Sequence, residues 1–401
     1  MSYTLISSVG TGMYKEGYRK TVYCFPSGEK IETHIFLNAL LKNKYRDISK
    51  IILVGTVTSG WDMLIDFDDE LWVKVYEAKE NDSIDQSIIS EIEIYLSNKL
   101  NIPVVIKYHT DKIVNDTSEE IFNLYSSIIP EITDENILFD ITHGFRSMPI
   151  LLYQALQFSI SQNPKIKNVE LVYGEYIESK KESYVRDLSN YWRYSQISDA
   201  LNVFKTKLDG YKLAELIEDE WTEGSKAIKR LSDVVQTNFS LQIIEVSKQI
   251  KNALKKYPTN APNWLEDIKS FLEEILNCVT SNSMYLSLYK YAEFLFERKL
   301  NVQAIITLQV AVETYIAEIN NCEDMIGNYD WWQSEGRALL NKIKKNDWKN
   351  IGNPLTNLEG FRNQIAHGGG SNRKGNPPSA ANIPDIYKSG IRGIKNLFNI
   401  Q

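Results

Sequence analysis

Residues 136–160 read NILFDITHGFRSMPILLYQALQFSI, and this stretch decides the fold class. Asn136–Ile141 is a short apolar run that predicts a buried strand, and Met148–Ile160 is expected to be a helix. Between them lies a polar turn that contains a glycine. A strand that leads directly into a helix is part of a βαβ unit, so the stretch indicates a mostly parallel sheet.

The chain alternates between strands and helices in the same way up to about residue 180. The other predicted strands are Tyr3–Val9, Thr21–Phe25, Ile51–Val54, Val104–Ile106 and Val169–Tyr173, and the other predicted helices are Ile31–Leu41, Ile84–Leu100 and Glu119–Ile129. This order predicts an α/β domain, in which ligands bind at the carboxyl ends of the strands.

From about Arg186 the strand pattern fades, and the second half of the chain is expected to be all helical. The predicted helical stretches are Leu188–Leu216, Ser225–Lys256, Trp264–Cys278 and a region from Ser283, then a loop at Gly368–Pro378 and a last short helix. One apolar stripe, long enough for a core and for part of an interface, comprises Val302, Ile305, Leu308, Val312, Ile316 and Ile319. We therefore expect an α/β domain at 1–180, a helical connector at 181–282 and a helical domain at 283–401.

Composition narrows the class of protein. The 401 residues are 43% hydrophobic and 24% charged, which is typical of a soluble globular chain of two or three domains. Cys24, Cys278 and Cys322 form no CxxC pair, so we expect neither disulfides nor a cysteine zinc site, and a cytoplasmic location. Neither a signal peptide nor a membrane span is expected. With a net charge of −7, any nucleic-acid site must be a local basic patch.

The turn after Asn136–Ile141 has the residues that an anionic phosphate ligand needs. Thr142, His143 and Arg146 supply donors, Gly144 permits close approach of the backbone, and free N–H groups open the following helix. The alternative, a turn at Asp140 and Thr142 that only caps the helix, stays open.

Two other loops follow predicted strands. The first, Ser7–Gly12, includes Ser8, Gly10, Thr11 and Gly12, but a lone GxG fits a plain turn equally well. The second, Gly55–Trp61, offers the Thr56 hydroxyl and an aromatic ring suited to stacking on a base. Because these loops would share one edge of the sheet with the 140–149 turn, the three together predict a phosphate-rich, nucleotide-like ligand.

A second candidate site is Gly360–Gly368, GFRNQIAHG. On a helix Asn363 and His367 share a face and Arg362 lies beside them, a set that can hold a phosphodiester and move protons. From Gly360 onward one acid, Asp385, stands against six basic residues, Arg362, Arg373, Lys374, Lys388, Arg392 and Lys395. The alternative is a histidine that only complements the helix dipole beside a solvated loop. Neither HxxxH nor HExxH occurs, so the sequence predicts no catalytic metal.

These motifs resemble those of a known family. DITHGFRSMP resembles the DxTHG motif of CRISPR-associated accessory proteins that begin with a Rossmann-like CARF domain, and SSVGTGMY is similar to the loop after their first strand. RNQIAHG resembles the R-x4-6-H signature of HEPN ribonuclease domains. The resemblance implies a type III CRISPR effector: a ribonuclease for single-stranded RNA that is activated by cyclic oligoadenylate, with cyclic tetra-adenylate favoured over cyclic hexa-adenylate.

The resemblance also implies roles for particular residues. Arg362, Asn363 and His367 would be catalytic in a metal-independent cleavage, and two chains of a homodimer, or of a higher even oligomer, would complete one active site. The activator would be bound by Ser8, Gly10, Thr11, Gly12, Thr56, Thr142, His143, Gly144, Phe145 and Arg146. Two alternatives remain: a sensor that binds RNA or a partner without cutting, and a CARF site that cleaves its own activator.

Overall fold

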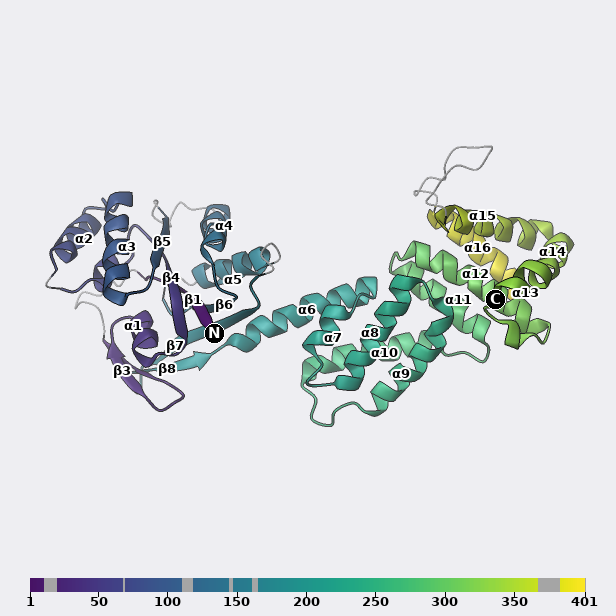
Figure 1. Ribbon diagram of the computed structural model, residues 1–401, viewed down its shortest axis with the longest axis horizontal. Coiled ribbons are helices and arrows are strands. Elements are labelled where there is room, and N and C mark those ends of the chain that lie inside the picture. The colour runs from purple at the N-terminus through teal and green to yellow at the C-terminus, as the bar shows by residue number, and fades with distance from the viewer. Residues whose placement is uncertain are drawn as a thin grey trace. The chain divides into compact units, whose positions relative to one another are not determined.

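The computed structural model describes residues 1–10, 20–67, 69–109, 118–143, 147–160, 165–366 and 383–400. The chain forms two compact units, Met1–Ser195 and Gln196–Gln401, and helix α6 (Ser189–Lys207) contains the boundary between them (Figure 1). The first unit is built on a sheet and the second consists of helices. This layout confirms the predicted α/β half followed by an all-α half.

The first unit has one eight-stranded sheet with the order β3-β2-β8-β7-β6-β1-β4-β5. The strands are β1 (Ser2–Ser8), β2 (Thr21–Cys24), β3 (Lys30–Thr33), β4 (Asp47–Thr56), β5 (Val104–His109), β6 (Asn136–Asp140), β7 (Asn168–Ile177) and β8 (Glu182–Asp187). The segment β7-β6-β1-β4-β5 is parallel throughout. Strands β7 and β8 pair antiparallel, as do β2 and β3, which makes the sheet mixed.

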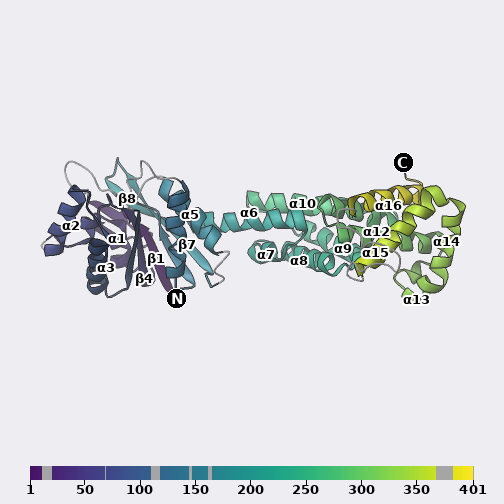
Figure 2. The ribbon, with the colours of Figure 1, turned by 90° about the horizontal axis from the view of Figure 1, so that it is seen from above.

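Helices cover both faces of this sheet, because successive strand residues point to opposite sides. Leu5 packs with α1 (Phe36–Asn43), α2 (Glu70–Glu80) and α3 (Gln86–Leu100), whereas its neighbour Ile6 packs with α4 (Ser118–Ser126) and α5 (Ser147–Ile160). Figure 2 shows the sheet between these helix layers. The unit is therefore a three-layer α/β/α sandwich.

One predicted element was wrong at its beginning. The predicted helix Ile31–Leu41 starts as strand β3, and helix α1 begins only at Phe36. Strand β3 pairs antiparallel with β2 through a tight turn at Gly28, whose φ of 87° favours glycine. The helical spacing of the apolar residues was thus overridden by a hairpin.

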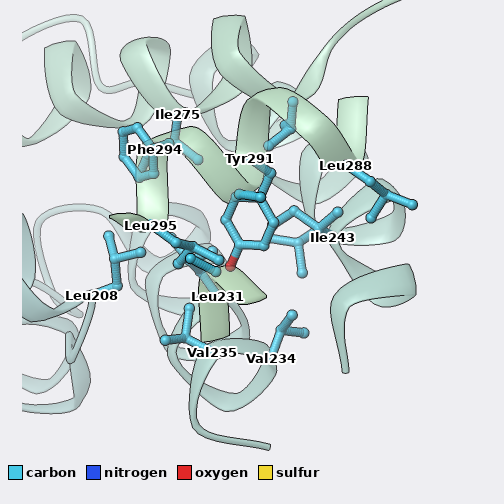
Figure 3. Packing of buried hydrophobic residues seen from close by; sticks show 14 of the residues in the cluster. Leu208, Leu231, Val234, Val235, Ile243, Ile275, Leu288, Tyr291, Phe294 and Leu295 are labelled. Atoms are coloured by element: carbon cyan, nitrogen blue, oxygen red, sulfur yellow. The ribbon is translucent and has the colours of Figure 1, made fainter. Parts of the chain in front are cut away.

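The described part of the second unit contains α-helices, two short π-helical segments, Trp332–Gly336 and Trp348–Gly352, and two short 3₁₀ helices, Ser240–Gln242 and Glu323–Met325. Its helices are α7 (Tyr211–Leu216), α8 (Thr222–Thr237), α9 (Ile243–Lys255), α10 (Asn263–Val279), α11 (Met284–Glu297), α12 (Asn301–Ile319), α13 (Tyr329–Trp331), α14 (Arg337–Asn346), α15 (Asn353–Ala366) and α16 (Ile383–Phe398). One hydrophobic core runs through it from Ile197 to Phe398. Figure 3 shows part of that core, where Tyr291 lies among Leu231, Val234 and Ile243. The last helix, expected to be short, has 16 residues.

Helix α12 is the described helix whose length and composition would allow it to cross a membrane. In this fold it is a core helix. Ile305, Leu308, Val312 and Ile316 of its apolar stripe are at most 1% exposed within a single chain. Most side chains of the stripe are therefore buried in the core of a single chain, and few of them are exposed to form an interface.

Candidate functional site

Three strand ends meet at one edge of the sheet, as predicted. In the sheet β1 lies between β6 and β4, all three strands are parallel, and Ser7 pairs with Asp140 while Ser8 pairs with Val54. After β1 the chain forms the β2–β3 hairpin at one end of the sheet, then β4 and β5 on one side of β1, and later β6 on the other side of β1. Such a reversal of strand order opens a crevice at the carboxyl ends, where α/β proteins bind ligands.

Asp140, the last residue of β6, forms buried hydrogen bonds at this edge of the sheet. Its carboxylate is fully buried and accepts hydrogen bonds from the Ser7 hydroxyl at 2.6 Å and from the Thr142 backbone N–H at 2.8 Å. Burial raises the pKa of the Asp140 carboxyl. Asp140 thus joins β1 to the turn after β6 and fixes the first residues of that turn.

Thr142 and His143 each tie the same turn to another element. The Thr142 hydroxyl accepts a hydrogen bond from the Gly174 N–H of β7 at 2.8 Å, and His143 Nε2 accepts one from the Phe36 N–H of α1 at 3.2 Å. A Cβ at position 174 would lie 2.9 Å from the Tyr23 ring and 3.1 Å from Thr142 Cγ2, so the close approach of β7 requires glycine. The turn is held from two sides.

The imidazole of His143 is neutral in this arrangement. Burial lowers its pKa, although the nearby Asp140 carboxyl acts in the opposite direction. Because Nε2 accepts a hydrogen bond, the proton is on Nδ1, which can donate to a ligand.

We expect a titration of the histidine ring protons by NMR to give His143 a pKa below the ordinary value of about 6.5. With a lowered pKa, protonation of His143 costs more free energy in the folded chain than in the unfolded chain. As the pH falls below about 6.5, the wild type should therefore lose stability that His143→Gln retains. The ring-proton resonance that is missing in His143→Gln is the resonance of His143. A His143 pKa of about 6.5 or above would contradict this account.

The other predicted ligand residues of this edge have different surroundings. The Ser8 hydroxyl is buried and has no hydrogen-bond partner among the described residues. The Gly10 carbonyl accepts a hydrogen bond from the Gly60 N–H at 2.8 Å, and the Thr56 hydroxyl lies 3.0 Å from that of Thr58. Five further predicted residues lie outside the described residues, namely Thr11, Gly12, Gly144, Phe145 and Arg146.

The interpretation of Trp61 as a base-stacking ring was wrong. Its indole is fully buried in the core under the sheet, and its N–H donates to the Thr56 carbonyl at 2.8 Å. The ring holds the Gly55–Trp61 loop in place and offers no face to a ligand.

The second unit has a cavity of about 150 Å³, to whose lining Arg362 and Asn363 of α15 contribute. The Arg362 guanidinium donates to the Asn363 side-chain oxygen at 3.1 Å, so the two predicted residues are in contact. His367 lies outside the described residues. Within the described ranges, no group of three or more His, Cys, Asp or Glu side chains could hold a metal ion.

Further charged residues line this cavity, and the sequence analysis did not single them out. Glu313 of α12 is half-buried, and burial raises the pKa of its carboxyl, although Arg362 and Arg337 act to lower it. Glu359 accepts from Lys344 at 2.6 Å and lies 3.9 Å from Arg337. The available signal was the pair Gln309 and Glu313, four residues apart on a mostly apolar helix.

In comparisons with known proteins, a segment of each unit matches a CRISPR-associated family. Residues 4–180 match the family described as "CRISPR system endoribonuclease Csx1, CARF domain". Residues 194–283 match the family described as "CRISPR-associated protein MJ1674, second domain". The chain is also similar to the CRISPR-associated protein MJ1674 of Methanocaldococcus jannaschii, at 25% identity over 406 residues.

That alignment covers 90% of this chain and 62% of the relative, so the chain spans less than two thirds of the relative's length. The matches together support a CRISPR-associated protein with a CARF domain of the Csx1 type.

Proposed function

We propose that the chain is a cytoplasmic endoribonuclease of type III CRISPR defence that cyclic oligoadenylate activates and that cuts single-stranded RNA. The observation that carries the proposal is the match of residues 4–180 to the CARF domain of an endoribonuclease family. The edge formed by β1, β4 and β6 would bind the activator. The cavity at Arg362 in the helical unit would bind RNA.

In the proposed chemistry the 2′-hydroxyl of a ribose attacks the adjacent phosphorus and leaves a 2′,3′-cyclic phosphate. Arg362 would stabilise the charge that develops on the phosphate, and the contact with Asn363 would orient the guanidinium. His367, from its place in the RNQIAHG motif, would orient the reacting groups or exchange protons. No catalytic metal or cofactor takes part in this proposal.

The direct test measures cleavage of a fluorogenic single-stranded RNA with and without cyclic tetra-adenylate or cyclic hexa-adenylate. We expect cleavage only with an activator, and cyclic tetra-adenylate to suffice. RNA that is bound with activator but never cut would favour the sensor alternative. Loss of the activator over time, without RNA cleavage, would favour a CARF site that cleaves its own ligand.

We also expect the active species to be a homodimer, or a higher even oligomer, because one chain supplies a single Arg362 and His367 and the proposed site uses two of each. Sedimentation at the concentration of the cleavage assay checks this. A monomer that cuts RNA would refute the shared active site.

A further inference from the structure

The cavity beside Arg362 has a polar wall made by one helix. Gln309, Glu313 and Thr314 of α12 line it. Thr314 is 1% exposed, and its hydroxyl has no hydrogen-bond partner among the described residues. A buried hydroxyl without a partner costs free energy, so a ligand that bonds to it gains affinity.

Glu313 is the carboxylate of this wall that is available to a ligand. The second carboxylate of the cavity, Glu359, is paired with the ammonium of Lys344 at 2.6 Å. Glu313 instead accepts a hydrogen bond from the neutral amide of Gln309 at 3.1 Å. The wall therefore presents at least one strong hydrogen-bond acceptor, the Glu313 carboxylate, to whatever enters the cavity.

The rest of the lining fits a flat ring that carries an anion. The cavity of about 150 Å³ has the size that holds one benzene-sized ring, and Trp331 and Trp332 supply aromatic surface for stacking. Arg337 and Arg362 are its cationic lining residues. A nucleotide has these features, because its base is an aromatic ring with hydrogen-bond donors and its sugar carries a phosphate.

We propose that this cavity receives the base of an RNA nucleotide next to the cleaved phosphate and selects cytosine over uracil; the inference rests on the proposed function. Cytosine presents an exocyclic amino group, a donor, where uracil presents the O4 oxygen, an acceptor. The amino group satisfies the Glu313 carboxylate, whereas O4 is repelled by it. A site built to bond one such group discriminates strongly against the analogue that lacks it.

The test compares 2′-O-methyl oligocytidylate with 2′-O-methyl oligouridylate, which cannot be cleaved, by fluorescence anisotropy on the full chain with cyclic tetra-adenylate. We expect the wild type to bind the cytosine oligomer at least about tenfold more tightly. In Glu313→Gln, whose amide can donate to O4, the ratio should fall to about threefold or less. Glu273→Gln, an exposed glutamate of α10 outside the cavity, is the matched control and should keep the wild-type ratio.

The inference is overturned if Glu313→Gln has the same ratio of cytosine-oligomer to uracil-oligomer affinity as the wild type. If that variant does not fold, Gln309→Met, which removes the amide that holds Glu313, should lower the ratio, and an unchanged ratio there has the same consequence.

Cleavage of matched RNAs with one cytosine or one uracil separates the two proposals. A Glu313-dependent preference in binding without any cleavage refutes the nuclease only, whereas cleavage without that preference refutes the base selection only.

Discussion

Replacing Arg362 or His367 by alanine is expected to abolish RNA cleavage while folding and activator binding stay intact. Removing one group that stabilises charge in a transition state lowers turnover by about 10² to 10³ or more. Arg362 lies on the cavity with its guanidinium bonded to Asn363, so its loss removes the cation that would face the phosphate. The measurement is the initial rate of cleavage at saturating activator.

The matched control for this variant is Lys256→Ala. Lys256 is an exposed cation of the same helical unit, paired with Glu223. Its loss changes the charge of the unit equally but should leave the rate near that of the wild type. An Arg362→Ala variant that cuts RNA at the wild-type rate would contradict the assignment.

The same assay tests the proposed chemistry. Cleavage should survive EDTA and should yield 2′,3′-cyclic phosphate ends, because the attacking group would be the 2′-hydroxyl of the substrate. If chelation stopped turnover, the metal-independent assignment would be wrong.

The second large effect is expected at the sheet edge. His143→Ala or Arg146→Ala should weaken binding of cyclic oligoadenylate, since each removes a donor or a charge from a site for several phosphates. A hydrogen bond to a charged group contributes about 1.5 to 3 kcal/mol, which corresponds to roughly tenfold to more than hundredfold in affinity. Calorimetric titration of cyclic tetra-adenylate measures the effect directly.

Titration of cleavage rate against activator distinguishes binding from transmission. We expect the half-maximal concentration to rise in both variants, with most of the maximal rate recovered at saturation. Arg186→Ala is the control, because Arg186 is an exposed guanidinium of β8 that pairs with Glu175. A His143 variant with unchanged affinity but a lower maximal rate would place this residue in transmission or in cleavage of the activator.

Sequence reasoning found the elements whose pattern is local and missed those that depend on a neighbour. Strand β8 was missed because ESYVRD has no continuous apolar run, and its place is decided by antiparallel pairing with β7. Helix α2 was also absent from the predicted elements. In fact Asp69 caps that helix by accepting from the Leu71 N–H at 2.9 Å.

The candidate sites divide in the same way. The turn at 140–143 stands out in the sequence because Asp, Thr and His follow a strand directly. Its bond to Ser7 depends on strand register across 133 residues, which no local pattern reveals. Glu313 and Arg362 likewise line one cavity only because α12 packs against α15.

The hydrogen bonds that hold Thr142 and His143 bear on the kinetics of ligand capture. Both side chains are already fixed, by Gly174 and Phe36 respectively, so a ligand does not have to order them on arrival. A preformed site avoids part of the entropic cost of association. Cyclic oligoadenylates of different ring size should therefore have similar association rate constants at this part of the site. Their affinities should differ mainly through their dissociation rate constants.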